Sequence, residues 1–126
     1  NIILDREVSD LEFENICKLT YIDNIVSDNS LSYDMPIEEN GANLSGGERQ
    51  RIILARSLLK KASIILIDEG LNQIDVVLER KILNNIFTHY QNKTIIIISH
   101  RTDNIDLYDK VFKLENSRIL EINNNN

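Results

Sequence analysis

The chain has 126 residues, 42% of them hydrophobic, and a net charge of −6 at neutral pH. This length suits one domain or a large part of one, and the hydrophobic fraction is sufficient for a packed core. Its apolar runs are far shorter than a membrane span, and we expect no signal peptide. Cys17 is the single cysteine, which excludes a disulfide framework or a cysteine-based zinc cluster and predicts a small buried thiol in a cytosolic protein.

The charge balance also bears on partners. A net negative charge argues against a general nucleic-acid surface, so we expect no nucleic-acid partner. Five basic residues nevertheless form a local stripe. They are Arg49, Arg51, Arg56, Lys60 and Lys61.

The first third of the chain predicts helices and then a loop. Ser9–Glu12 is a capping-box pattern that would begin a helix over roughly residues 10–19. Its apolar face would carry Leu11, Ile16, Cys17 and Leu19. A short helical piece is expected over about residues 22–27. Residues 28–43 contain a proline, a glycine and several Asn and Ser, with little periodicity, which indicates a loop.

The segment Leu44–Arg51, with the sequence LSGGERQR, opens an amphipathic helix that we expect to reach residue 61. Ser45 with Glu48 three places later makes a second capping box. Gly46 and Gly47 leave the start of the helix without side chains, and its unpaired N–H groups and positive dipole end are suited to phosphate. An ordinary capped helix explains the octapeptide equally well. The residues downstream must therefore decide between a phosphate-binding helix start and an ordinary one.

From residue 62 the pattern changes to strand, helix, strand. Residues 62–67 form an apolar run that ends in Asp68-Glu69, and residues 94–98 form a second run that ends in Ser99-His100. Both are typical of buried strands in a parallel sheet covered by helices, which predicts an α/β fold. Asp75 can cap the intervening helix. The apolar side chains of that helix recur at three- and four-residue spacing. They are Leu78, Ile82, Leu83, Ile86, Phe87 and Tyr90.

The acidic pair and the histidine would meet at one edge, because the carboxyl ends of parallel strands are where such sheets bind ligands. An Asp-Glu pair after an apolar strand has a defined use in phosphoryl transfer: the first carboxylate holds Mg²⁺ and the second polarises the attacking water. Asp68 and Glu69 fit these roles, and His100 could contact a γ-phosphate or orient Glu69. Strand ends also carry acidic and histidine side chains simply because the chain is entering solvent.

The last quarter of the chain predicts a hairpin. Residues 103–108 suggest a short helix or turn. Residues 111–114 and 119–122 would pair as two strands around a turn. The four asparagines at 123–126 are a low-complexity tail that we expect to be disordered.

These motifs together resemble the ATP-binding domains of ABC transporters. Leu44–Arg51 and its helix are similar to the signature motif of that family, and Ile64–Glu69 looks like the Walker B strand. Gly70–Asp75 occupies the place of the D-loop, although its sequence GLNQID departs from the usual ATSALD. Ser99–Arg101 occupies that of the H-loop. The order and spacing match from about residue 2 to residue 122.

The resemblance implies a partial P-loop NTPase (ABC ATPase) fold. Residues 1–61 would form the helical subdomain with the signature helix, and residues 62–122 the second half of the parallel-sheet core. No Gly-x-x-x-x-Gly-Lys-Ser/Thr motif occurs in the sequence. We therefore expect a C-terminal portion of the domain that lacks the Walker A half, and no ATP hydrolysis by the chain alone.

The resemblance also implies partners and roles. Two such domains would meet head to tail and close ATP and Mg²⁺ between them. The residues implied in nucleotide binding are Ser45, Gly46, Gly47, Glu48 and Asp75. Asp68 would be the metal ligand, Glu69 the general base or water-positioning group, and His100 a contact of the γ-phosphate.

The segment before the signature, residues 32–41, is similar to the one in ABC exporters that meets the coupling helices of the transmembrane domain, which gives Glu39 that role. The overall likeness is to bacterial exporters, including those of peptides and bacteriocins, acting at the cytoplasmic face of the membrane. An ABC-superfamily ATPase of DNA maintenance or repair is the alternative, since such proteins also use Ser-Gly-Gly-Glu. A regulatory fragment that has lost its ATPase half is a third reading.

Overall fold

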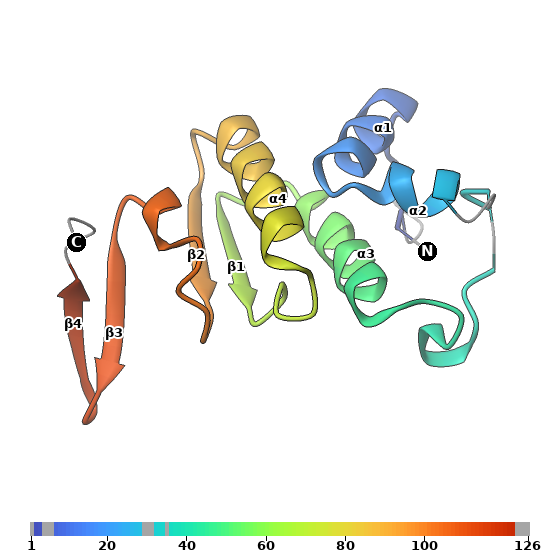
Figure 1. The fold of residues 1–126 in the computed structure, drawn as a ribbon. Coiled ribbons are helices and arrows are strands. Elements are labelled where there is room, and N and C mark those ends of the chain that lie inside the picture. Colours follow the sequence, from blue (N-terminus) through green and yellow to red (C-terminus); the bar gives the residue numbers. More distant parts are fainter. Residues whose placement is uncertain (1, 4–6, 29–31, 35, 123–126) are drawn as a thin grey trace.

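The computed structural model describes residues 2–3, 7–28, 32–34 and 36–122 of the chain (Figure 1). The helices are α1 (Asp10–Leu19), α2 (Ile22–Asp28), η1 (Glu39–Gly41), α3 (Gly46–Leu58), α4 (Val76–His89) and η2 (Ile105–Leu107). The strands are β1 (Ile64–Asp68), β2 (Thr94–Ile98), β3 (Val111–Glu115) and β4 (Arg118–Ile122).

The predicted helices and strands are confirmed, with shifts at their ends. The signature helix ends at Leu58 and not at residue 61, because Leu59 already has cap geometry. A single short helix, η1, lies within the described part of the predicted loop. The predicted disordered tail at 123–126 lies outside the described residues.

The strand–helix–strand unit is parallel, as predicted. Strand β1 pairs with β2 in a register that sets Ile64 opposite Thr94 and Asp68 opposite Ile98, and α4 is the crossover between them. Both strands therefore end at the same edge of the sheet. The predicted hairpin is confirmed as the antiparallel pair β3–β4. Figure 1 shows it standing apart from α1–α4, beyond β2.

The core lies between the helices and one face of the two strands. Helices α3 and α4 lie on the same side of β1 and β2 (Figure 1), and the strands contribute Ile65 and Ile67 to this interface, each 6% exposed. The helices contribute Ile16, Cys17, Leu54, Ala55, Leu58, Ile82, Leu83 and Ile86. Five of these are fully buried: Cys17 of α1, Ala55 of α3, and Ile82, Leu83 and Ile86 from the predicted apolar stripe of α4.

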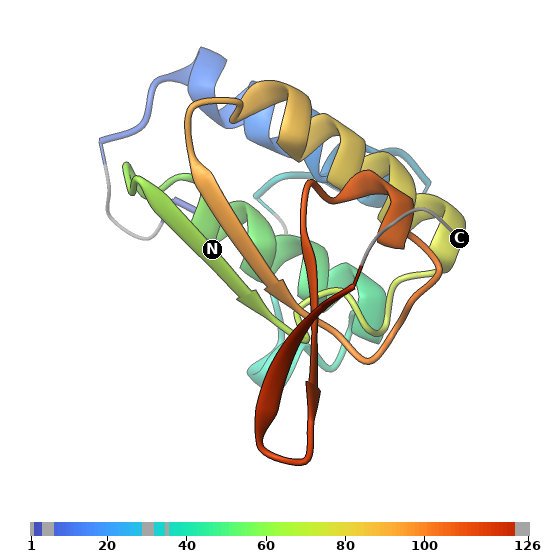
Figure 2. The ribbon, with the colours of Figure 1, turned by 90° about the vertical axis from the view of Figure 1, so that its left-hand side faces the viewer.

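The opposite face of the strands is exposed, which corrects the prediction that helices bury these strands. Ile64 and Leu66 are 60% and 61% exposed, and Ile96 and Ile98 are 47% and 48% exposed. The reason is that, within the described residues, the segment after β2 forms a short 3₁₀ turn and a hairpin and not a helix that could cover this face. In Figure 2 this face points toward the viewer, with the helices behind.

One predicted member of the α1 apolar face is also wrong. Leu11 is 68% exposed, whereas Ile16 and Cys17 are buried. Five residues of an α-helix turn through about 500°, so Leu11 points about 140° away from Ile16. The predicted buried thiol is confirmed, and burial, with a smaller contribution from the charge of Asp23, raises the pKa of Cys17 to about 12. None of the helices described here is long and apolar enough to cross a bilayer.

Candidate functional site

The start of α3 is built by a reciprocal pair of hydrogen bonds. The Glu48 backbone N–H donates to Ser45 Oγ at 3.2 Å, and the Ser45 N–H donates to Glu48 Oε2 at 2.7 Å. The predicted capping box is therefore confirmed. These bonds satisfy two backbone donors and leave other N–H groups of the first helical turn, including that of Gly46, without a partner inside the helix.

Another part of the chain approaches both glycines at this start closely, with a side chain at Gly46 and with the backbone at Gly47. A Cβ on Gly46 would lie 1.9 Å from Gln73 Oε1, and one on Gly47 would lie 2.9 Å from the carbonyl oxygen of Gln73. Both distances are below van der Waals contact. The connector between β1 and α4 therefore packs on the signature glycines, and Gln73 is a site residue that sequence reasoning missed.

A cleft of about 510 Å³ opens between the start of α3 and the start of α4. All five predicted nucleotide-binding residues line it, together with Arg51, Gln73, Ile74 and Leu78. Asp75 caps α4, because its Oδ1 accepts from the Leu78 N–H at 2.9 Å. Two helix N-termini thus face one cleft, and their dipoles favour a negatively charged group there.

The carboxyl edge of the sheet brings Glu69 and His100 into contact. His100 Nε2 lies 2.8 Å from Glu69 Oε1. Asp68 ends β1 directly before Glu69 and is exposed to solvent. The predicted meeting of the acidic pair and the histidine at one edge is therefore confirmed, while the chemical roles of the three residues stay predictions.

Glu69 stands in an uncommon backbone conformation. Its φ of 48° lies in the left-handed region, which costs a residue with a Cβ about 1–3 kcal/mol. Its N–H donates to the Ile98 carbonyl at 2.9 Å, and its carbonyl accepts from Gln50 Nε2 at 3.3 Å. These bonds hold the turn that directs the Glu69 side chain toward His100 as the chain leaves β1.

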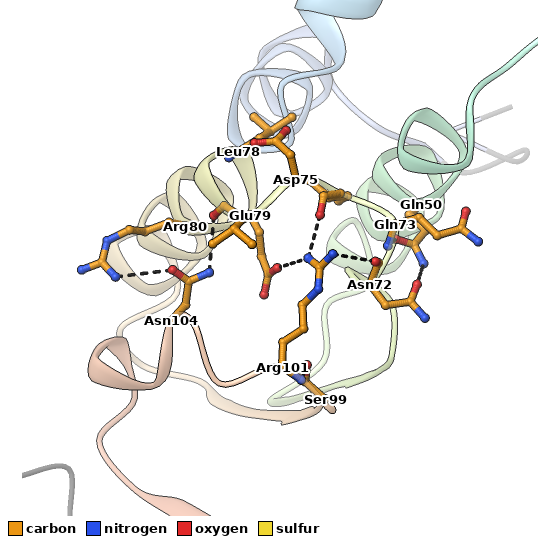
Figure 3. Close-up of polar contacts among 12 residues, drawn as sticks. Gln50, Asn72, Gln73, Asp75, Leu78, Glu79, Arg80, Ser99, Arg101 and Asn104 are labelled. Carbon is orange, nitrogen blue, oxygen red and sulfur yellow. Dashed lines mark hydrogen bonds and ion pairs between the residues drawn. The ribbon is translucent and has the colours of Figure 1, made fainter. Parts of the chain in front are cut away.

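Arg101 joins three parts of the chain beside this edge (Figure 3). Its Nη1 donates to Glu79 Oε2 at 2.6 Å and to the Ile74 carbonyl at 2.7 Å, and its Nη2 donates to the Asn72 carbonyl at 2.9 Å. Glu79 is only 4% exposed. Sequence reasoning assigned no role to this pair. One signal was present: Glu79 precedes Ile82 by three places, which sets a carboxylate on the apolar face of α4.

Gln50 is a further residue that sequence reasoning missed. Its Oε1 accepts from the Gln73 N–H at 2.8 Å, and its Nε2 also donates to Asn72 Oδ1. Gln50 therefore ties α3 to the same connector that Arg101 holds from the other side. Nothing in the sequence pattern distinguishes it from an exposed helical glutamine.

Comparison with known proteins decides the family. A family profile described as "ABC transporter" matches residues 7–72, which is more than half of the chain. The chain belongs to the ABC transporter family. The predicted fold class, an α/β partial ABC ATPase fold, is confirmed by this match and by the parallel β1–β2 unit.

Several ABC relatives are similar over most of the chain. An ATP-dependent lipid A-core flippase of Pseudoalteromonas translucida is 35% identical over 118 residues, covering 94% of this chain and 20% of the relative. Mating factor M secretion protein mam1 of Schizosaccharomyces pombe is 33% identical over 122 residues, covering 96% and 9%. The glutathione/L-cysteine transport system protein CydC of Haemophilus influenzae is 46% identical over 83 residues, covering 66% and 14%. The chain thus spans about a fifth or less of the length of these relatives.

Two of the basic residues near the ABC signature hold loops in place. Arg49 Nη1 donates to the carbonyls of Gly41 at 3.2 Å and Leu44 at 3.0 Å, and Arg51 Nη1 donates to the Tyr21 carbonyl at 2.7 Å. The guanidinium groups of the predicted basic stripe are therefore partly engaged in structural bonds.

The donor set at the Walker B edge fits Mg²⁺ bound together with a nucleotide. The described residues contain no group of three or more His, Cys, Asp or Glu side chains that could hold a metal ion by themselves. Mg²⁺ usually takes one or two carboxylates, with substrate phosphates and water as its other ligands. The exposed carboxylate of Asp68, next to Glu69, is a group of this kind, and its role as a metal ligand stays a prediction.

Proposed function

We propose that the chain is part of the ATP-hydrolysing domain of an ABC transporter of the exporter type, acting at the cytoplasmic face of a bacterial membrane. The observation that carries this proposal is the contact of Glu69 with His100 at the end of β1, directly after Asp68. Relatives named as a flippase and as a secretion protein support export over import and over DNA maintenance. The narrower likeness to peptide and bacteriocin exporters stays a prediction.

The domain organisation that we propose follows the two halves of the chain. Residues 1–61 hold the helical subdomain, and residues 62–122 hold the second half of the ATPase core. The cleft between the starts of α3 and α4 would take the γ-phosphate of a nucleotide bound to a second such domain. Ser45, Gly46 and Gly47 would donate to it, and Glu48 and Asp75 would keep the two helix starts capped around it.

At the Walker B edge, Asp68 would hold Mg²⁺ through its exposed carboxylate. The ion, when bound, supplies positive charge that balances the phosphates. Glu69 would accept a proton from the attacking water or orient that water. His100 would donate to the γ-phosphate, and its 2.8 Å contact with Glu69 would hold that carboxylate in place.

The proposed partner surface for a transmembrane domain is the Glu39 region. Glu39 begins η1, and Asn40, the next residue of η1, has a left-handed φ of 56°. Arg49 of the signature helix donates to the carbonyl of Gly41, at the end of the same turn. A movement of this loop would therefore be transmitted to the start of α3.

The experiment that tests the proposal uses the longer protein that contains this chain. Glu69→Gln keeps the size of the side chain and removes its basicity, so ATP turnover should fall about 10²–10⁴-fold while ATP binding persists. Glu115→Gln, on the exposed hairpin, is the matched control and should leave turnover unchanged. Equal turnover in both variants would remove Glu69 from this role.

Two further measurements separate the alternatives. Substrate movement in vesicles that depends on ATP supports the transporter, whereas turnover stimulated by DNA without transport would support the DNA-maintenance alternative. The 126-residue chain alone should not hydrolyse ATP, because its sequence contains no Walker A motif. Turnover by the isolated chain that Glu69→Gln abolishes would contradict this expectation.

A further inference from the structure

The connector Gly70–Ile74 is held from one side by the guanidinium of Arg101. Two of its carbonyls, those of Asn72 and Ile74, accept from Arg101 at 2.9 and 2.7 Å. Figure 3 shows the Arg101 side chain extending from the segment after β2 toward both carbonyls and toward α4. Because Arg101 directly follows His100, this contact joins the connector to the residue that pairs with Glu69.

The third acceptor, the carboxylate of Glu79, makes it energetically unfavourable for the Arg101 side chain to move away from the connector. Glu79 Oε2 lies 2.6 Å from Arg101 Nη1, and the Glu79 side chain is only 5% exposed. A buried carboxylate that loses its cationic partner is left uncompensated, which is strongly unfavourable. The guanidinium is planar and offers several donors at fixed angles, so it can serve two carbonyls and a carboxylate at once. The position of Arg101 is thus determined by two elements simultaneously.

The other side of the connector is held by α3. Gln50 accepts from the Gln73 N–H and donates to the carbonyl of Glu69. Gln73 itself lies against Gly46 and Gly47. A displacement of the connector would therefore change two things together: the packing of Gln73 on Gly46 and Gly47, and the backbone turn at Glu69.

We propose that Arg101 is a positioning residue for the ATP chemistry. Its guanidinium donates to two carbonyls of the connector and to the Glu79 carboxylate. It holds the connector so that the Glu69–His100 contact and the packing of Gln73 on the signature glycines are set together. The consequence for turnover rests on the proposed function, whereas the consequence for the connector does not.

The chain offers a matched control for the Arg101–Glu79 pair, which separates the loss of any arginine–carboxylate pair from the release of the connector. Arg80 pairs with Asp106 through both of its terminal nitrogens, also from α4, but this pair is exposed and lies away from the connector. Arg80→Met therefore removes an arginine–carboxylate pair without releasing the connector. Arg101→Met with Glu79→Met removes both charges of the pair, so that no unpaired carboxylate is left in the core.

The test measures hydrogen exchange and steady-state kinetics in the longer protein that contains this chain. In Arg101→Met/Glu79→Met, amide exchange over residues 69–75 should accelerate about tenfold or more, as local opening becomes about 1.4 kcal/mol easier. Its kcat should fall about 10²-fold, the size of effect that a misplacement of about 1 Å can have, with KM for ATP within about threefold. Arg101→Lys should have a kcat between those of the double variant and the wild type, since an ammonium group cannot donate to all three acceptors with the fixed geometry of a guanidinium.

Two outcomes would overturn the proposal. One is a double variant whose exchange over 69–75 equals that of Arg80→Met. The other is a double variant with faster exchange and unchanged kcat, because the connector would then not set the chemistry. A wild-type protein without any ATP turnover would instead contradict the proposed function, and the exchange experiment would still decide whether Arg101 holds the connector.

Discussion

Gly47 and Gln73 approach each other so closely that a Cβ on Gly47 would lie 2.9 Å from the carbonyl oxygen of Gln73. This contact joins the ABC signature to the connector that follows the Walker B strand. The oxygen belongs to the backbone, which Gln50 and Arg101 hold from either side through the Gln73 N–H and the neighbouring carbonyls. The signature of this chain is therefore shaped by packing within one subunit as well as by any ligand.

The first prediction compares the two glycines of the signature. Gly47→Ala forces the connector backbone to move and should destabilise the chain by about 1–2 kcal/mol, after allowance for the better helix propensity of alanine. Gly46→Ala meets the end of the flexible Gln73 side chain and should change stability by less than about 0.5 kcal/mol. Urea unfolding of the two variants checks this. Equal losses would show that the Gln73 backbone moves freely.

The second prediction concerns the cap of α3. Ser45→Ala removes the acceptor of the Glu48 N–H and one half of the capping box, which should cost about 1 kcal/mol. Ser45→Asp keeps an acceptor at the N-cap and should stay within about 0.5 kcal/mol of the wild type. Because Ser45 is exposed, lost packing does not contribute. Thermal and urea unfolding measure the free energies of unfolding of the two variants. A Ser45→Ala variant as stable as the wild type would show that the cap does not stabilise α3.

The third prediction concerns His100. His100→Ala removes the contact with Glu69 and should lower ATP turnover of the longer protein by at least about tenfold. His89→Ala is the control, because His89 lies at the C-terminal end of α4 and contacts the ring of Tyr90. Steady-state assays at saturating ATP compare the two. If both variants turned over alike, the Glu69–His100 contact would have no part in the chemistry.

The fourth prediction contrasts the two faces of β1. Ile65 points into the core at 6% exposure, whereas its neighbour Leu66 is 61% exposed. Ile65→Thr should therefore cost about 2 kcal/mol or more, and Leu66→Thr less than about 0.5 kcal/mol. Leu66→Thr should also weaken the binding of a dye that fluoresces on apolar surfaces. A large stability loss in Leu66→Thr would mean that this face is covered.

The sequence predicted local structure well because its signals are local. Ser45 and Asp75 marked the starts of α3 and α4, and the three- and four-residue spacing identified the buried stripe of α4. The isoleucine runs of β1 and β2 could not show that only one face is buried, since an all-apolar strand has no alternation to reveal its exposed side. The apolar pattern of α1 includes Leu11 on its apolar face, although its helical angle places it about 140° from Ile16.

The site was predictable where one motif places a residue and not where two segments must meet. Asp68, Glu69 and His100 follow strands whose ends share an edge, so their proximity could be inferred from topology. The pairing of Arg101 with Glu79 depends on how α4 packs against the segment after β2, and the contact of Gln73 with Gly47 depends on the path of the connector. Neither relation has a sequence period or a motif that would reveal it.

The last prediction concerns pH and the thiol of Cys17. Burial raises its pKa to about 12, whereas an unfolded cysteine has a pKa of about 8.5. Below the unfolded value both states keep the proton, so this contribution to stability is complete. As the pH rises toward 12 the unfolded chain releases its proton and the folded chain does not, so stability falls by up to about 1.4 kcal/mol per pH unit. Unfolding free energies of the wild type and Cys17→Ala at pH 8, 9 and 10 check this. Their difference cancels the other titrating groups and should shrink with pH, and a difference independent of pH would show that the thiol ionises equally in both states.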